Sequence, residues 1–184
     1  MLNDIGFALW FLLPGACANV APIFAAALPY LKTFSYPIDG GKIWRGKRIL
    51  GAHKTWRGIT AGVLVSSLVF FWQINATGSY DWAATLAGPV DYSTLPWILG
   101  PLFGLGALGG DALKSFVKRR LDIKPGAKWV PFDQVDYILG SITVTLPFVV
   151  VGFKYYVWML VVWFLAHLVA SYIGWLLKLK EQPI

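Results

Sequence analysis

The sequence predicts an all-α integral membrane protein with about five transmembrane helices. Hydrophobic residues make up 57% of its 184 residues, and the mean hydropathy of +0.61 lies well above that of soluble domains. The 10 Trp and 8 Tyr residues suit helices that end among lipid headgroups. Apolar segments long enough to cross or nearly cross a bilayer lie at residues 5–28, 59–74, 95–113, 137–153 and 155–177.

The connections between these segments leave no room for a separate soluble domain. The first segment has no positively charged residue ahead of it and continues past Pro14, so we expect a retained helix and not a cleaved signal peptide. The second and fourth segments are the shortest. Polar stretches reach only about 20–30 residues, which is below the size of most independent domains. We therefore expect one transmembrane domain over residues 1–184.

The distribution of Lys and Arg predicts the orientation. Of the 16 basic residues, seven lie between the first and second segments and six between the third and fourth, while Lys178 and Lys180 follow the fifth. The connection 75–94 contains two Asp residues and no basic residue. Because basic loops stay in the cytoplasm, we expect a multi-pass cell-membrane protein with its N-terminus outside and its C-terminus in the cytoplasm. The two basic loops would then form a site on the cytoplasmic face.

Residues 110–120 mix acids, bases and a hydroxyl at the end of the third segment. A helix places four of these side chains along one stripe: Asp111, Ser115, Lys118 and Arg119. The preceding Gly109 and Gly110 keep the helix narrow, so that another backbone or a ligand can approach closely. Arg120 faces the opposite side, where we expect it to anchor lipid headgroups. Charges beside a bilayer are costly, which indicates that this stripe has a partner or a function.

Two further acids, Asp133 and Asp136, share a face if the fourth helix begins near residue 132, just after Pro131. With Asp111 they supply three carboxylates, the oxygen ligands that Mg²⁺ prefers, and leave positions for water and phosphate. The alternative is structural: Asp133 caps the helix and Asp136 stabilises its dipole. Acids for a metal beside bases for phosphates favour a metal-bound polyphosphate as the ligand.

The first basic loop, residues 39–58, carries five glycines among its bases. Glycines allow tight turns with exposed N–H groups, which favour anions. Donors for phosphates cluster near its end: His53, Lys54, Thr55 and Arg57. The spacing is not that of a Walker A loop. Basic loops by themselves indicate only topology and attraction to anionic headgroups, but this density and the neighbouring acids indicate anion or nucleotide binding.

Isolated polar residues inside the apolar segments are less informative. Asn19 lies between Pro14 and Pro22, where it either lines a cavity or hydrogen bonds to another helix. His167 is expected to be a packed, hydrogen-bonded residue, and Cys17 a small core residue. One cysteine excludes an internal disulfide and a cysteine metal cluster. No nucleic-acid motif is present, so we expect no nucleic-acid partner.

The combined motif resembles the signature of membrane phosphatidate cytidylyltransferases (CDP-diacylglycerol synthases). The matching pattern is Gly110-Asp111-x3-Ser115-x2-Lys118-Arg119, then Lys124, then Asp133-Gln-Val-Asp136. Gln134 replaces the usual Arg, and an H-G-G element before the final acids is missing. Residues 51–58 and the pattern Pro14-x3-Ala18-Asn19-x2-Pro22 are similar to the archaeal branch, the CDP-archaeol synthases. The resemblance covers about residues 14–140.

The resemblance implies a reaction in which CTP and a lipid phosphate give a CDP-lipid and pyrophosphate. For the archaeal branch the lipid is an unsaturated isoprenoid glycerol ether phosphate. Mg²⁺ on Asp111, Asp133 and Asp136 would bind triphosphate oxygens, and Lys118 would act with these acids in catalysis. The remaining residues would bind CTP and the lipid phosphate: Asn19, His53, Lys54, Thr55, Arg57, Ser115, Arg119 and Lys124.

Two other classes of function stay open from the residues alone. One is a different membrane phosphotransferase, acting on a polyprenyl or diacylglycerol phosphate with the same metal and phosphate chemistry. The other is a non-enzymatic membrane protein that binds lipid headgroups. Such a protein has no reason to place three acids among its bases. The sequence leaves the oligomeric state open.

Overall fold

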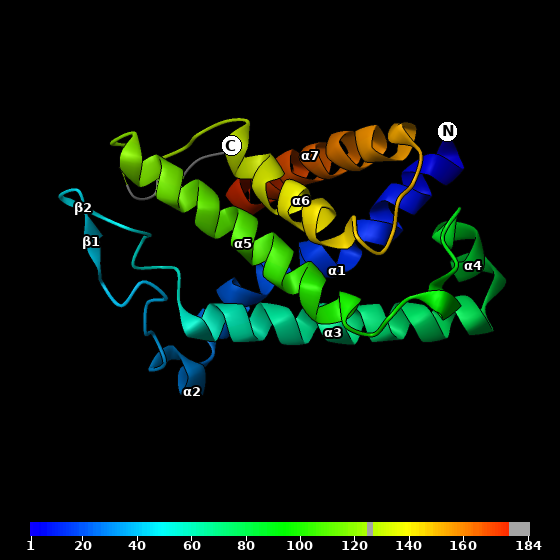
Figure 1. Ribbon diagram of the computed structural model, residues 1–184, viewed down its shortest axis with the longest axis horizontal. Coiled ribbons are helices and arrows are strands. Elements are labelled where there is room, and N and C mark those ends of the chain that lie inside the picture. The colour runs from blue at the N-terminus through cyan, green and yellow to red at the C-terminus, as the bar shows by residue number, and fades with distance from the viewer. Residues whose placement is uncertain (125–126, 177–184) are drawn as a thin grey trace.

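The computed structural model describes residues 1–124 and 127–176, and five long helices dominate it (Figure 1). Their bounds are α1 Leu2–Ala27, α3 Trp56–Ser79, α5 Leu99–Arg120, α6 Phe132–Thr145 and α7 Phe153–Leu176. Short elements join them: α2 Pro29–Lys32, strands β1 Ile43–Trp44 and β2 Lys47–Arg48, α4 Asp81–Ala87 and the 3-10 turn η1 Tyr92–Thr94. Successive long helices run in alternate directions, so that both basic loops lie at the same end of the molecule.

Three of the helices are long and apolar enough to cross a membrane: α1, α3 and residues Phe153–Ile173 of α7. The charged end of α5 lowers its hydropathy. The predicted fourth apolar segment, 137–153, is wrong at its end, since α6 ends at Thr145, whereas the helix does begin at Phe132, directly after Pro131. Its 14 residues extend about 21 Å, less than the ~30 Å bilayer core. Pro147 lies just beyond, where its ring and missing N–H oppose a longer helix.

The other predicted segments overlap long helices whose ends differ from the predicted ones. The second extends to 56–79, and the third begins at Leu99 and continues through the charged stripe to Arg120. Residues 177–184, with the C-terminal lysines used for the orientation, lie outside the described residues.

Glycines let α5 contact both of its neighbours through the backbone. A Cβ on Gly104 would lie 2.8 Å from the Cα atom of Val63 on α3. A Cβ on Gly106 would lie 2.6 Å from the carbonyl oxygen of Gly140 on α6, and one on Gly110 would overlap the Asp136 carbonyl. This spacing of small residues is typical of close helix pairs in membranes. The expectation that Gly110 admits another backbone is confirmed, and that backbone carries Asp136.

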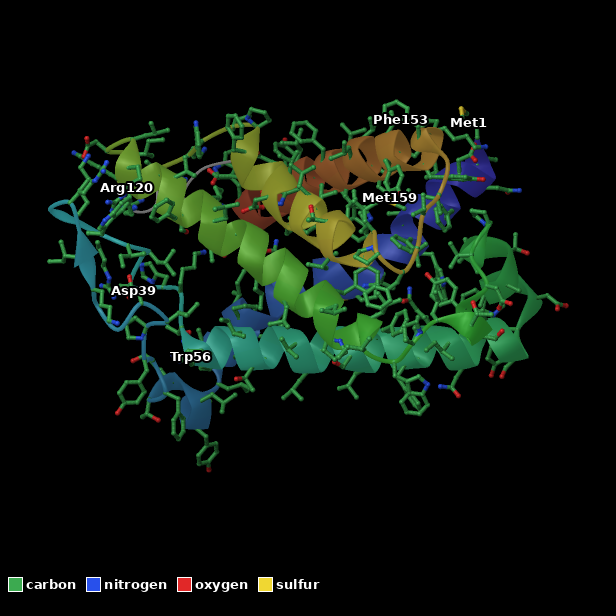
Figure 2. The ribbon with its side chains drawn as sticks, viewed as in Figure 1. Met1, Asp39, Trp56, Arg120, Phe153 and Met159 are labelled. Atoms are coloured by element: carbon green, nitrogen blue, oxygen red, sulfur yellow. The ribbon has the colours of Figure 1, made fainter. Side chains whose placement is uncertain are left out.

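Helix α1 packs against all the other long helices and contributes much of the core. Phe7 and Phe11 are buried on it, and the Phe11 ring lies 5.5 Å from the ring of Phe103 on α5, edge to face. Figure 2 shows how the bundle separates two ends. Asp39, Trp56 and Arg120 lie at one end, and Met1 and Phe153 at the other. The first of these ends holds the candidate site.

Candidate active site

A cavity of about 560 Å³ opens at the end of the bundle that carries both basic loops. Helices α1, α5, α6 and α7 and the segment that leads into α3 all contribute to its wall. Eight of the twelve predicted site residues line it: Asn19, His53, Lys54, Thr55, Arg57, Asp111, Asp133 and Asp136. The fold therefore brings together two motifs that are more than fifty residues apart in the chain.

The three predicted acids converge on one lysine that the prediction left out. The Nζ atom of Lys114 lies 3.2 Å from a carboxylate oxygen of Asp111, 3.1 Å from one of Asp133 and 2.6 Å from one of Asp136. Lys54 pairs with the other Asp111 oxygen. These side chains are largely withdrawn from solvent, and that of Lys114 is 14% exposed. The acids thus form a single cluster.

Helix phase explains why Lys114 belongs to this cluster. At about 100° per residue, Lys114 and Lys118 lie roughly 60° and 20° to one side of Asp111. Ser115 and Arg119 lie roughly 40° and 80° to the other side. Helix α6 packs on the first side, so it meets the two lysines. The i, i+3 spacing of Asp111 and Lys114 was the available sequence signal.

Lys118 is buried and holds Asp133 in place. Its Nζ atom donates to both Asp133 carboxylate oxygens, at 3.0 and 3.1 Å, and to the Ala127 carbonyl at 2.5 Å. The Trp129 N–H also donates to Asp133, at 2.6 Å. Asp133 therefore closes the turn before α6 and does not cap the helix, whose N-cap is Pro131. Lys118 touches the acid and does not line the cavity.

The first basic loop meets the cavity through the residues just before and within the start of α3. Thr55 is the N-cap of α3, and its side-chain oxygen accepts from the Gly58 N–H at 3.2 Å. Arg57 donates to the carbonyls of Leu31 and Lys32, at 2.9 and 3.1 Å, which ties the loop to α2. Both residues lie on the cavity wall. These hydrogen bonds hold the Thr55 and Arg57 side chains in place, and so fix the direction in which their other N–H and O–H groups point.

Asp39 organises the same loop from a position that the sequence analysis did not assign. Its carboxylate accepts from the Arg48 guanidinium at 3.1 and 3.2 Å, and from the N–H groups of Gly41 and Leu50 at 3.0 and 2.9 Å. The Arg48 hydrogen bond, opposed by burial and assisted by the two N–H groups, lowers the pKa of Asp39 to about 2. The hydrogen bonds to Asp39 therefore fix the conformation of this loop and the positions of its basic residues.

The expectation that Arg120 anchors lipid headgroups is wrong. Its guanidinium donates to the carbonyls of Trp44, Lys47 and Arg48, at 2.5, 3.1 and 2.8 Å. It also stacks on the Trp44 and Phe116 rings, 5.1 and 5.3 Å from their centroids. Helical phase does turn Arg120 away from the acids, but the β1–β2 hairpin fills that side. Arg120 therefore docks the hairpin on α5.

Four predicted site residues are absent from the cavity wall: Ser115, Lys118, Arg119 and Lys124. Two polar residues on the wall come from the apolar segments, where the sequence indicates little about their role. Asn19 lines it between two prolines of α1, and His167 lines it from α7 while its ring packs 6.3 Å from that of Tyr137. His167 is thus both a packed residue and part of the cavity.

The acid cluster has the chemistry that Mg²⁺ requires, with one qualification. Within residues 1–124 and 127–176, no group of three or more acidic, His or Cys side chains is arranged so that it could hold a metal ion. The Asp111, Asp133 and Asp136 oxygens instead surround the Lys114 ammonium. Three carboxylates share one cation there, and carboxylate oxygens are the ligands that Mg²⁺ prefers.

Apolar helices with a charged cavity at one end define a membrane protein with a polar site at the end of its bundle. A solved structure described as an intramembrane enzyme for archaeal membrane lipids biosynthesis matches with a TM-score of 0.72 and 31% identity, over 89% of this chain and 92% of that one.

The sequence comparisons identify the family. The profile described as CarS-like CDP-archaeol synthase matches residues 1–184. CDP-archaeol synthase of Thermococcus kodakarensis is 32% identical over 99% of this chain and 98% of its own length. That of Methanopyrus kandleri is 34% identical over 98% and 94%. The chain belongs to the CDP-archaeol synthase family, whose members are cytidylyltransferases of membrane lipid biosynthesis.

Proposed function

We propose that this chain transfers the cytidylyl group of CTP to the phosphate of an unsaturated isoprenoid glycerol ether, giving CDP-archaeol and pyrophosphate. One observation carries the proposal. Three acids from two helices meet the basic residues of a distant loop on the wall of one cavity in a bundle of apolar helices. This arrangement suits a nucleotide from the aqueous side and a phosphate that belongs to a lipid.

The reaction needs no Ser or Cys nucleophile. An oxygen of the lipid phosphate attacks the α-phosphorus of CTP, the bond from that phosphorus to the β-phosphate oxygen breaks, and pyrophosphate leaves. The protein has to bring two anions together and stabilise the charge that spreads over the phosphates. Lys54 and Arg57 line the cavity and supply that positive charge, and the His53 ring beside them can take part in hydrogen bonds. The Thr55 hydroxyl and the Asn19 amide there can orient the substrates.

Mg²⁺ is part of this proposal, and Asp111, Asp133 and Asp136 would hold it. When bound, it would screen the triphosphate and polarise the reacting phosphate. Lys118 positions Asp133 for that role. Arg119, Ser115 and Lys124 stay outside the cavity wall, so we assign them to the basic surroundings of its mouth and not to the reacting phosphates.

An apolar groove gives the lipid tails a place beside the cavity. It has a volume of about 760 Å³ and lies between α1 and α3, with Cys17, Phe24 and Leu64 among its walls. Arg57 lines both the groove and the polar cavity. A lipid phosphate held near Arg57 would keep its chains among apolar side chains while its headgroup meets CTP.

Transfer of label tests the reaction. Purified protein with α-labelled CTP and the unsaturated ether phosphate should give a labelled lipid that requires Mg²⁺, whereas γ-labelled CTP should give labelled pyrophosphate only. A polyprenyl phosphate and a diacylglycerol phosphate serve as competing acceptors. Label transfer to the polyprenyl phosphate alone, or none from CTP, would contradict the assignment.

The proposed orientation has five spans with the cavity facing the cytoplasm. Within a Cys17→Ser background, Ser79→Cys and Lys42→Cys place single thiols at opposite ends of the bundle. An impermeant reagent applied outside intact cells should label position 79 and spare position 42, because the basic loops stay inside. The cysteine is placed at position 42 of this loop and not at the nearby Gly46, because the φ of +74° at Gly46 would strain a cysteine. External labelling at position 42 would reject this orientation.

A further inference from the structure

Lys114 occupies the one point that all three acids share. Lys54 pairs with Asp111 and Lys118 with Asp133, but Lys114 reaches Asp111, Asp133 and Asp136 together. Lys114 is also not one of the signature positions on this helix, which are Asp111, Ser115, Lys118 and Arg119. Its contacts are therefore a property of how α5 and α6 pack.

A divalent cation and the Lys114 ammonium cannot use these oxygens together. Mg²⁺ binds carboxylates at about 2.0–2.1 Å, so an ion among the three acids would lie where the Nζ atom now lies, 2.6–3.2 Å from their oxygens. Two cations cannot occupy the same position, and two that lie side by side in a partly buried site repel each other strongly. One must leave before the other binds.

The Lys114 side chain can move its ammonium group away from the three acids. Its charge sits at the end of a flexible four-carbon stem, and Nζ can move without a change in the backbone. Lys114 lines the polar cavity, so a displaced ammonium stays next to the phosphates that enter there. Without Lys114, Asp136 would lose its ammonium partner beside two other carboxylates that are paired with Lys54 and Lys118, so the ion-free enzyme also needs the charge of Lys114.

We infer that Lys114 is a resident counter-ion, which holds the three carboxylates in place before substrate binds and gives way to the divalent cation. The inference deepens the proposed function and rests on its metal assignment. It makes Lys114 a positioning residue for the acids in the ion-free enzyme and a competitor of the metal. Lys114 thereby sets how tightly the site binds a divalent ion in the absence of CTP.

Mn²⁺ binding measured by electron paramagnetic resonance, on detergent-purified protein without CTP, tests this. Lys114→Met should lower the Kd for Mn²⁺ by tenfold or more, because metal binding then displaces no charge. Its melting temperature without metal should fall below that of the wild type, and saturating Mn²⁺ should restore it. Lys128→Met is the matched control: it removes the same charge from an exposed position outside the acid cluster, so its Kd should stay near that of the wild type.

The outcomes separate the two claims. Equal or weaker Mn²⁺ binding by Lys114→Met, with binding by the wild type intact, overturns the counter-ion role and leaves the metal site standing. Binding by none of the proteins overturns both. If Lys114→Met does not fold, Lys114→Gln, which removes the charge but keeps a hydrogen-bond donor beside the acids, provides the same comparison of Kd.

Discussion

The two ends of the helix bundle are held together by different chemistry. At the cavity end, acids and bases from distant segments pair with one another, as in the cluster of Asp133, Lys114 and Lys118. At the opposite end, aromatic rings pack instead. The Trp10 ring lies 5.2 Å from that of Trp72 and 5.7 Å from that of Trp82. Few charges lie there, apart from the exposed pair of Lys154 with Asp4.

This difference shows where function is concentrated. Aromatic rings at a membrane interface stabilise the bundle through buried area and need no exact electrostatic balance. Clustered charges next to apolar helices are stable only while each has a partner. At the cavity end one substitution therefore disturbs the balance of several charges at once, and the following predictions test that contrast.

The largest loss is expected from the acids. Asp133→Asn and Asp136→Asn should each lower CTP-dependent turnover by at least about 10²-fold, because an amide keeps the volume but lacks the charge that a divalent ion needs. Both variants should still insert and fold. Mg²⁺ should raise the melting temperature of the wild type and of neither variant. Asp122→Asn removes an exposed acid and should keep turnover near that of the wild type. Full turnover in either first variant would reject that acid as a ligand.

Lys118→Met should come next, with a loss of about 10²-fold in turnover. Asp133 would lose the ammonium that fixes both of its oxygens, and a small displacement of a catalytic group has an effect of this size. Steady-state kinetics with varied Mg²⁺ should show that more metal is needed for half-maximal rate. Lys128→Met removes the same charge from an exposed position of the neighbouring loop. Equal losses in both variants would mean that bulk positive charge is what matters.

A smaller effect is expected from Arg120. Arg120→Ala removes the donors to three carbonyls of the β1–β2 hairpin, which should cost the hairpin about 1–2 kcal/mol and raise the KM for CTP more than it lowers kcat. Protease cleavage within residues 42–48 should become faster. Arg120→Lys keeps the charge and loses the planar fork, so it should not restore protection. Restoration by Lys would favour attraction to lipid headgroups instead.

The smallest effect concerns acid stability of the first basic loop. The folded pKa of Asp39, about 2, lies below its usual value of 3.8, so its contribution is complete above pH 4 and is lost as the pH falls toward 2. That contribution is at most about 2 kcal/mol. Hydrogen exchange at the N–H groups of Gly41 and Leu50 should report the opening. In Asp39→Asn these two N–H groups should have little protection from exchange at any pH, relative to the intrinsic rate of an unstructured amide at that pH. Protection in the wild type that does not change between pH 5 and pH 2 would contradict the role of Asp39.

Part of the site was predictable because it depends on local spacing. The pair Asp133 and Asp136 lies on consecutive turns of one helix whatever α6 packs against, and the cavity does contain both. The presence of several hydrogen-bond donors among residues 53–57, which line the cavity, likewise follows from composition. Asp39 and the hairpin were missed because turns closed by one carboxylate have no periodicity, and a two-residue strand has no pattern to read.

The sequence by itself determined that this protein is helical and apolar, that its bases gather in two connections, and that three acids stand near them, because hydropathy and helical spacing are local properties. The tertiary structure decided which side of α5 faces the acids of α6. That choice depends on backbone contact between Gly106 or Gly110 and the helix that carries Gly140. This packing brings Lys114 to the centre of the three carboxylates and leaves Ser115 and Arg119 outside the cavity wall. Successive residues of a helix point about 100° apart, so the neighbouring Lys114 and Ser115 face different surroundings.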